Sequence, residues 1–506
     1  MKKFVRKGNL EEQKLALRAE YDFIIRGAFR MLKEESLSKE EKIKMLQRDY
    51  YQIAGEDVQR NELFYERLEK IKLELQEKTK KKVNQHFFEV LGLFLNAGIL
   101  DQAEHDELKD FQKTVKVNTR ANCKPTKGLE HSWPKLMEFE NNKIEKNKEI
   151  AEKLIEFMKS KTESELTLKR KIEALEFVYK EIYAKVDFAD KYESGEFGFS
   201  LYGSFVNQFS IQASDIDVSL DIADYDDYDE MNVLRFLQSK IPKTLRDSPD
   251  IKIVSPEESM RIPVLEIELK KWDLIISFSV NNVLGGINSK LIKTYSEIDP
   301  RCQMLGILVK LWAKAHDLGS TKKNFLSSYA YNLMVINYLQ TMRNPILPSL
   351  QAIRYEDPMS EQLAEFKEVR RQDKKSDKST KYKVRVDYED DLEVIKKYMK
   401  DNDFKENKKT TIQLLKGFFK FYKNKRKFEG ITLSVKHGRR LKRNEENDEK
   451  KYLYSIEDPF DKYHNPGKYL TATHFNVDTM LRCMKRSYRL LKEKKIMEIF
   501  EPFEDD

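Results

Sequence analysis

One short stretch of the chain, residues 201–222, constrains the fold more than any other; it reads LYGSFVNQFSIQASDIDVSLDI. An apolar run leads into Gly203 and Ser204, and Asp215 follows eleven residues after Ser204, with Asp217 two residues further on. Apolar residues then alternate with polar ones, which predicts a β-strand. Residues two apart in a strand face the same side, so Asp215 and Asp217 share one face.

Two carboxylates on one strand face repel each other unless a cation lies between them. Their hard oxygen ligands favour Mg²⁺ or Mn²⁺. The Gly203-Ser204 turn upstream offers backbone N–H groups and a hydroxyl to a phosphate, and glycine lets the backbone approach closely. An isolated Asp-x-Asp is common in ordinary turns, so the glycine turn and the strand-like setting are what make this pair a candidate metal and phosphate site.

Composition excludes several other kinds of site. Three cysteines, none at C-x-x-C spacing, argue against structural zinc and against a disulfide framework, which favours a reducing compartment. The N-terminus lacks the apolar segment of a signal peptide, and no apolar run approaches 18 residues. We therefore expect an intracellular protein, cytoplasmic or nuclear, with no membrane span. The net charge of +8 fits a polyanionic partner, but 94 basic against 86 acidic residues is a weak excess.

The length of 506 residues predicts two to four domains. Good helix formers dominate residues 1–160, which we expect to be a helical extension. Residues 161–285 contain expected strands at 251–254, 262–269 and 274–280, and residues 286–506 are predominantly helical, including an amphipathic helix at 411–422. Residues 356–382 are charged and poor in apolar residues, which predicts a loop insertion.

The glycine turn followed by Asp215 and Asp217 resembles the hG[GS]…Dh[DE]h motif of the polymerase-β nucleotidyltransferase superfamily. Over about residues 165–500 the resemblance narrows to the terminal uridylyltransferases and the non-templated poly(A) polymerases. It implies a bilobal α+β fold, with a small mixed-sheet catalytic lobe, a helical lobe that recognises the nucleotide, and here an all-α N-terminal extension. In that family an RNA 3′-hydroxyl attacks the α-phosphate of a nucleotide. Asp215 and Asp217 would hold the two metal ions, Mg²⁺ or Mn²⁺.

Three further blocks resemble family segments that bind the nucleotide. They are NNVLGGINS at 281–289, KLWAK at 310–314 and LSSY at 326–329. The resemblance implies that Asn288 and Ser289 recognise the ribose and the base. It implies that Lys310 and Lys314, on one helical face, neutralise the triphosphate. Ser328 would contact a phosphate, and Tyr329 would stack on the base.

A last block, IEDPFDKYHNPG at 456–467, resembles the loop that selects the base. In the uridylyltransferases of this family a histidine at this position narrows the pocket against a purine, with an aspartate supporting it. The resemblance therefore assigns base selection to His464 and its support to Asp458, and it favours UTP. ATP, with a poly(A) polymerase activity, remains the alternative among enzymes.

The family's third carboxylate is missing from its usual place. It normally precedes the Asn-Asn pair in a D-I-x-F segment, and that position holds Ser277 here. The nearest upstream carboxylate is Asp273. It shares a strand face with Ser277 but would lie about 13 Å from it, so Asp273 can act as the third carboxylate only if the strand slips or bulges. Two hypotheses follow: Asp273 reaches the site and the enzyme is active, or the chain binds UTP and RNA as a weakly catalytic scaffold.

The expected substrates are UTP and a single-stranded RNA with a free 3′ end. No zinc-finger or RRM-type signature accompanies the motifs, so RNA choice is expected to depend on a protein partner. The charged helices of residues 1–160 are the expected docking surface for that partner.

Overall fold

The computed structural model describes residues 38, 40–45, 148–182, 197–222, 229–256, 262–356, 364–372, 379–443, 452–471 and 475–502. The chain divides into two compact units, residues 1–122 and 123–506. In the first unit the description covers one short helical stretch, whose start is capped by reciprocal bonds between Ser38 and Glu41. The predicted helical extension therefore lies mostly outside the described residues.

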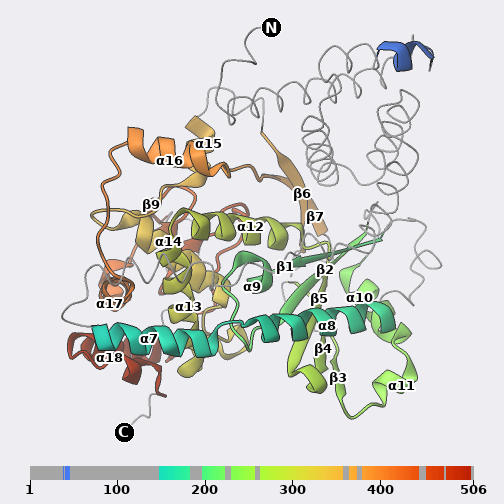
Figure 1. Cartoon of the computed structure of the whole chain (residues 1–506), viewed down its shortest axis with the longest axis horizontal. Helices are drawn as coiled ribbons and strands as arrows, with labels where there is room; N and C mark the ends of the chain where they lie inside the picture. Colours follow the sequence, from blue (N-terminus) through green and yellow to red (C-terminus); the bar gives the residue numbers. More distant parts are fainter. Residues whose placement is uncertain are drawn as a thin grey trace, which may run out of the picture. The chain divides into compact units, whose positions relative to one another are not determined.

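A five-stranded mixed sheet organises the first half of the second unit, and its strand order is β1-β2-β5-β4-β3 (Figure 1). Strands β2 and β5 are parallel, whereas the other neighbouring pairs are antiparallel. In chain order the strands are β1 (Phe197–Tyr202), β2 (Ile216–Ile222), β3 (Ile251–Val254), β4 (Leu265–Leu269) and β5 (Leu274–Val280). The strands expected at 251–254 and 274–280 are thus confirmed.

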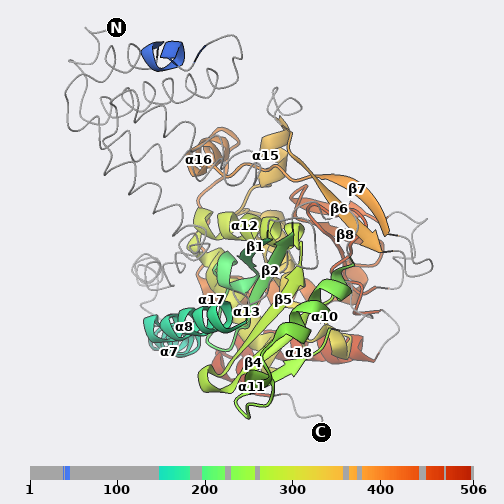
Figure 2. The same cartoon turned by 90° about the vertical axis from the view of Figure 1, so that its right-hand side faces the viewer.

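One face of this sheet is buried under helices, and the other carries polar residues. The alternate apolar residues of β2, β4 and β5 form a core with α8 (Glu165–Glu181) and α10 (Glu230–Lys240). Figure 2 shows α10 lying along the sheet. The short helices α9 (Ser204–Asn207) and α11 (Lys243–Arg246) lie in the connections between strands. Because side chains alternate along a strand, the residues between the core positions face the opposite side.

A second core holds the helical lobe together, and it centres on the buried Trp312 and on aromatic residues of α17. Polar caps start its helices: the Asp299 side chain accepts from the Arg301 N–H at the start of α13, and Thr410 and Gln413 form a capping box on α17. The helices are α7 (Lys148–Lys161), α12 (Val283–Ile298), α13 (Pro300–Ala315), α14 (Ser328–Thr341), α15 (Leu350–Glu356), α16 (Leu392–Asp401), α17 (Thr411–Tyr422) and α18 (Asn476–Lys492).

A small three-stranded sheet completes the helical lobe, with β10 (Ser455–Glu457) and β9 (Arg439–Lys442) on either side of β8 (Ile431–Ser434). None of the helices in the described ranges is long and apolar enough to cross a membrane.

The loop predicted for residues 356–382 is wrong, because a two-stranded antiparallel hairpin occupies much of it. Its strands are β6 (Phe366–Gln372) and β7 (Ser379–Arg385). Val369 and Tyr382 face each other across the pair and pack against the helical core. The Tyr382 hydroxyl also donates to Asp461 Oδ1 at 2.8 Å. Cross-strand pairing and this packing stabilise strands whose charged composition is untypical of a sheet.

Candidate functional site

The two predicted acids lie at the start of β2, on the sheet face opposite the core formed with α8 and α10. Asp217 is paired with Tyr202 of β1 on one side and with Ser277 of β5 on the other. Asp215 directly precedes the strand and is exposed, whereas Asp217 is half-buried. Within the described residues neither carboxylate takes part in a hydrogen bond or a salt bridge. Both carboxylates therefore remain available to a ligand.

The glycine of the predicted turn approaches Asp217 very closely. Gly203 has φ +73°, and a Cβ atom built on it would lie 1.8 Å from Asp217 Oδ2. A side chain at position 203 is therefore excluded both by backbone conformation and by this contact. The Gly203 N–H donates to Ser289 Oγ at 2.8 Å. This hydrogen bond ties the turn to α12, and the contact of the turn with a phosphate stays a prediction.

The electrostatics of the pair favour a bound cation. Burial, and next the neighbouring Asp215, raise the pKa of Asp217 to about 7. Burial also raises the pKa of Asp215, an effect that Lys310 opposes and Glu266 reinforces. Keeping two adjacent carboxylates ionised is costly without a counter-charge. Two neighbouring carboxylates offer hard oxygen donors, which are the ligands that suit Mg²⁺ or Mn²⁺.

Basic residues lie within electrostatic range of both acids. The Lys310 ammonium donates to Ser214 Oγ at 2.7 Å and to the Phe209 carbonyl at 3.2 Å. Burial, and next the charge of Lys171, lower the pKa of Lys310 to about 8, while Asp217 and Asp215 oppose that shift. Lys314, one turn further along α13, is exposed, and its charge also acts on Asp215. The two predicted lysines are thus brought beside the acids.

Sequence reasoning missed one buried cation, Lys171 of α8. Its ammonium pairs with Glu163 and donates to Ser210 Oγ at 3.3 Å and to the Ile211 carbonyl at 3.4 Å. The pKa values of Asp215 and Asp217 are raised by burial, and the positive charge of Lys171 opposes that rise. A single lysine in a helix rich in charged residues gives no sequence signal, so only the packing reveals this contribution.

The condition under which Asp273 could serve as the third acid is not met. The β4–β5 ladder pairs residues one for one from Leu265–Phe278 to Leu269–Leu274, without a slip or a bulge. Asp273 lies in the turn between these strands, exposed and in the left-handed conformation with φ +49°. It is therefore four residues from Ser277, at the far end of the strand.

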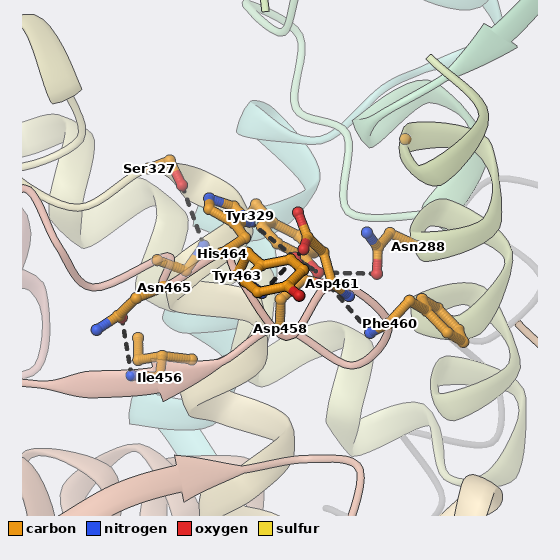
Figure 3. A network of polar contacts seen from close by, with 12 residues as sticks. Asn288, Ser327, Tyr329, Ile456, Asp458, Phe460, Asp461, Tyr463, His464 and Asn465 are labelled. Carbon is orange, nitrogen blue, oxygen red and sulfur yellow. Dashed lines mark hydrogen bonds and ion pairs between the residues drawn. The ribbon is translucent and has the colours of Figure 1, made fainter. Parts of the chain in front are cut away.

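The nucleotide-recognition residues of the helical lobe meet in one polar network (Figure 3). The Tyr329 hydroxyl lies 2.8 Å from Asn288 Oδ1 and 3.1 Å from Asp458 Oδ2. His464 Nδ1 lies 2.9 Å from the same Asp458 oxygen. Residues from α12, α14 and the loop after β10 are thus joined, although they lie up to 176 positions apart in the sequence, from Asn288 to His464.

Asp458 is held as a carboxylate in this network. Burial works against ionisation, but hydrogen bonds from His464 and from the backbone N–H groups of Asp461 and Phe460 lower its pKa overall. An ionised carboxylate only accepts hydrogen bonds, so His464 Nδ1 must carry the donated proton. This contact fixes the orientation of the imidazole ring and puts a proton on Nδ1, so that in the neutral form Nε2 is an acceptor.

The loop that carries His464 is anchored by Asn465. Its Oδ1 accepts from the N–H groups of Ile456 at 3.0 Å and Gly467 at 2.9 Å. A Cβ atom on Gly467 would lie 1.8 Å from the Tyr454 carbonyl oxygen, so the loop requires glycine there. The HN-x-G part of the motif therefore fixes the loop conformation around the histidine.

Three predicted serines differ in whether their hydroxyls already make hydrogen bonds within the protein. The Ser289 hydroxyl donates to the Gly285 carbonyl at 2.7 Å while it accepts from Gly203, so it is occupied inside the protein. The Ser204 hydroxyl makes no hydrogen bond within the described residues. Ser328 is exposed at the start of α14, where the neighbouring Ser327 provides the cap. The Ser204 and Ser328 hydroxyls therefore remain available to a ligand, whereas the Ser289 hydroxyl is engaged within the protein and its contact with a nucleotide stays a prediction.

Comparison with known proteins shows which families and folds this chain is similar to. Residues 150–297 match the central palm domain of the mitochondrial-like poly(A) RNA polymerases, and residues 412–464 match the Cid1 family of poly A polymerases. Terminal uridylyltransferase 4 of Homo sapiens is 28% identical over 267 residues, which are 53% of this chain and 15% of that protein. Poly(A) RNA polymerase GLD2-B of Xenopus laevis is 33% identical over 153 residues, 30% of each chain. This chain thus spans less than a third of the length of either relative.

Solved structures show the same fold. The Cid1 poly(U) polymerase superposes with a TM-score of 0.54 at 22% identity, covering 70% of this chain and 99% of that one. The structure of mtPAP in complex with ATPγS gives a TM-score of 0.53 at 20% identity, with 70% of this chain and 73% of that one covered. The predicted α+β polymerase-β-type fold is therefore confirmed.

Proposed function

We propose that this member of the terminal uridylyltransferase and non-templated poly(A) polymerase family adds nucleotides, without a template, to the 3′ end of RNA. The observation that carries the proposal is the close contact of Gly203 with Asp217, which places two unpaired carboxylates beside a turn that admits no side chain. Lys310 and Lys314 supply positive charge next to them. This combination suits a triphosphate with its divalent ions better than any uncharged ligand.

In the proposed reaction, some residues of the chain bind the metal ions and others bind the phosphates. Asp215 and Asp217 hold Mg²⁺ or Mn²⁺, which, when bound, neutralises charge on the attacking and leaving oxygens. The RNA 3′-hydroxyl gives its proton to water as its oxygen attacks the α-phosphorus. The bond from the α-phosphorus to the bridging oxygen breaks, and pyrophosphate leaves with both bond electrons. Lys310 and Lys314 balance the charge on the β- and γ-phosphates. Ser204 and Ser328 have hydroxyls available to phosphate oxygens.

We further propose that the nucleotide is UTP. The Asp458 carboxylate holds His464 in place, and Tyr329 and Asn288 belong to the same hydrogen-bond network. The base would therefore contact polar side chains whose positions are fixed. Side chains in fixed positions discriminate between uracil and a purine better than mobile ones, because they cannot adjust to the larger base. Tyr329 also offers an aromatic ring on which the base can stack.

ATP is the second candidate, because the GLD2 relatives are named poly(A) RNA polymerases. A weakly catalytic scaffold is a third candidate, since Ser277 stands beside Asp217 where the family places a carboxylate. The acceptor is proposed to be single-stranded RNA. A protein partner that docks on the N-terminal segment, and supplies the choice of RNA, remains a prediction.

One experiment separates these candidates. The purified full chain is incubated with a 5′-labelled single-stranded RNA and each of the four nucleoside triphosphates singly, with Mg²⁺ or Mn²⁺. We expect a ladder of extended products with UTP and little extension with the other three. A ladder with ATP alone supports the poly(A) polymerase, and no extension with any nucleotide and either ion rejects the enzyme.

A further inference from the structure

The sheet register reveals a carboxylate that the motif comparison did not find. Ser277 of β5 pairs with Asp217 on one side and with Glu266 of β4 on the other. Residues paired across neighbouring strands project from the same face of a sheet. Asp217, Ser277 and Glu266 therefore form a row across three strands, with the two acids separated by two strand spacings, about 10 Å between Cα atoms.

The burial pattern of β4 confirms which way Glu266 points. Leu265, Ile267 and Leu269 are fully buried in the core under α8 and α10, whereas Glu266 is half-buried on the opposite, polar face. Within the described residues its carboxylate makes no hydrogen bond or salt bridge. Its negative charge also acts on Asp215, whose pKa it helps to raise. Glu266 thus faces the acidic pair with no partner of its own.

We propose that Glu266 is the third metal-binding carboxylate of this site and replaces the one missing at position 277. This inference rests on the proposed nucleotidyl transfer. Two features make the exchange of strands possible. Serine at 277 is small, so its side chain fills little of the space between β2 and β4, and glutamate has one methylene more than aspartate to cross that space. Within the described residues no three such side chains are assembled as a metal site, so binding of the ion requires the Glu266 carboxylate to move toward it.

The same strand provides a matched control. Glu268 lies two residues further along β4, on the same face, but it pairs with Ile275 and forms a salt bridge with Lys252 at 3.3 Å. It has the same charge and chemistry as Glu266, but it lies further from Asp217. Replacing either glutamate by glutamine keeps its size and removes its charge. A general effect of surface charge therefore changes both variants alike, whereas an ion-binding role changes only Glu266→Gln.

The first test measures Mn²⁺ binding by titration calorimetry and by electron paramagnetic resonance, in the presence of a non-hydrolysable UTP analogue. We expect Glu266→Gln to weaken the more weakly held Mn²⁺ about tenfold or more, since losing even an indirect support for a metal ligand has effects of that size. Glu268→Gln should bind Mn²⁺ as the wild-type protein does. Equal Mn²⁺ affinity in the two variants and the wild type would overturn the assignment.

The second test moves the carboxylate back. In the double variant Glu266→Gln with Ser277→Asp, an aspartate stands one strand closer to Asp217, at the usual family position. We expect this variant to recover both Mn²⁺ binding and RNA extension that Glu266→Gln loses. A thermal melt of each variant shows whether it is folded, and a folded double variant that recovers neither property would contradict the proposal.

The two readouts separate this inference from the proposed function. If the wild-type chain extends RNA and Glu266→Gln extends it equally well, the nucleotidyl transfer stands and the role of Glu266 fails. If the wild-type chain extends no RNA but loses Mn²⁺ affinity on Glu266→Gln, Glu266 is a metal ligand and the proposed enzyme is rejected.

Discussion

Gly203 and Asp217 are in such close contact that a methyl group on the glycine would stand 1.8 Å from the Asp217 Oδ2 atom. Gly203 directly follows β1 and Asp217 lies at the start of β2, and these two strands are paired neighbours in the sheet. The position of the carboxylate is therefore set by the absence of a side chain on the turn. The strand pairing and the glycine together aim Asp217 at the site.

Gly203→Ala tests this contact. The added methyl group must displace the Asp217 carboxylate, and the φ of +73° is unfavourable for alanine. Because a displacement of about 1 Å at a reacting centre can reduce a rate about 100-fold, we expect a loss of RNA extension of that order. Gly286→Ala in α12 is the control, because a Cβ there meets nothing within 4 Å. Similar activity of the two variants would show that the contact does not matter.

Tyr329→Phe tests the polar network. The change keeps the ring but removes the hydroxyl that lies 2.8 Å from Asn288 Oδ1 and 3.1 Å from Asp458 Oδ2. Without this hydroxyl, Asn288 and Asp458 must be ordered when the nucleotide binds, so we expect the KM for UTP to rise about tenfold with kcat nearly unchanged. Steady-state kinetics check this split. Tyr329→Ala should raise the KM further, and an unchanged KM in both would remove Tyr329 from the nucleotide site.

His464→Asn tests the choice of base. The histidine is held by the Asp458 carboxylate at 2.9 Å, and asparagine is smaller and cannot reproduce that position. We expect the ratio of kcat/KM for UTP to that for ATP to fall about tenfold or more. His437→Asn is the control, because His437 lies in the turn between β8 and β9, bonds to Ser434 and to Glu457 of β10, and is not a residue of the proposed site. An unchanged ratio in His464→Asn would assign base choice elsewhere.

The dependence of metal binding on pH follows from the raised pKa of Asp217, which is about 7 in the ion-free protein. The carboxylate must lose its proton before it binds a cation, so protons compete with the ion below this pH. We expect the apparent Mn²⁺ affinity to rise about tenfold between pH 6 and pH 8, as expected for one deprotonation. Asp217→Asn should bind weakly at both pH values, and a flat profile in the wild-type chain would contradict the raised pKa.

The sequence predicted the parts of the fold that depend on local patterns. Short runs rich in apolar and β-branched residues identified β3 and β5, and amphipathic spacing identified α17 at residues 411–422. It failed at β6 and β7, whose charged residues are typical of a loop. Those strands form because Val369 and Tyr382 pair with each other and pack on the helical lobe, which are contacts between distant segments. Such packing has no counterpart in a local composition.

The site shows the same division. The motifs identified Asp215, Asp217 and the residues of the network that holds His464, because these lie in contiguous blocks. They did not identify Glu266, whose relation to Asp217 depends on the order β2-β5-β4 and on the register of both ladders. Alternation in LEIEL indicates that Glu266 faces away from the core. Which residues lie opposite it is a property of the assembled sheet.

The most direct test of the account compares the wild-type chain with the double variant Asp215→Asn and Asp217→Asn in extension of a labelled RNA by UTP. Asparagine has nearly the same size as aspartate but carries no charge, so the fold is kept while the ion-binding pair is removed; a thermal melt verifies this. We expect a ladder of products from the wild-type chain and none from the folded variant. Equal ladders from both proteins would contradict the central claim. A wild-type chain that extends the RNA with none of the nucleotides would contradict it as well.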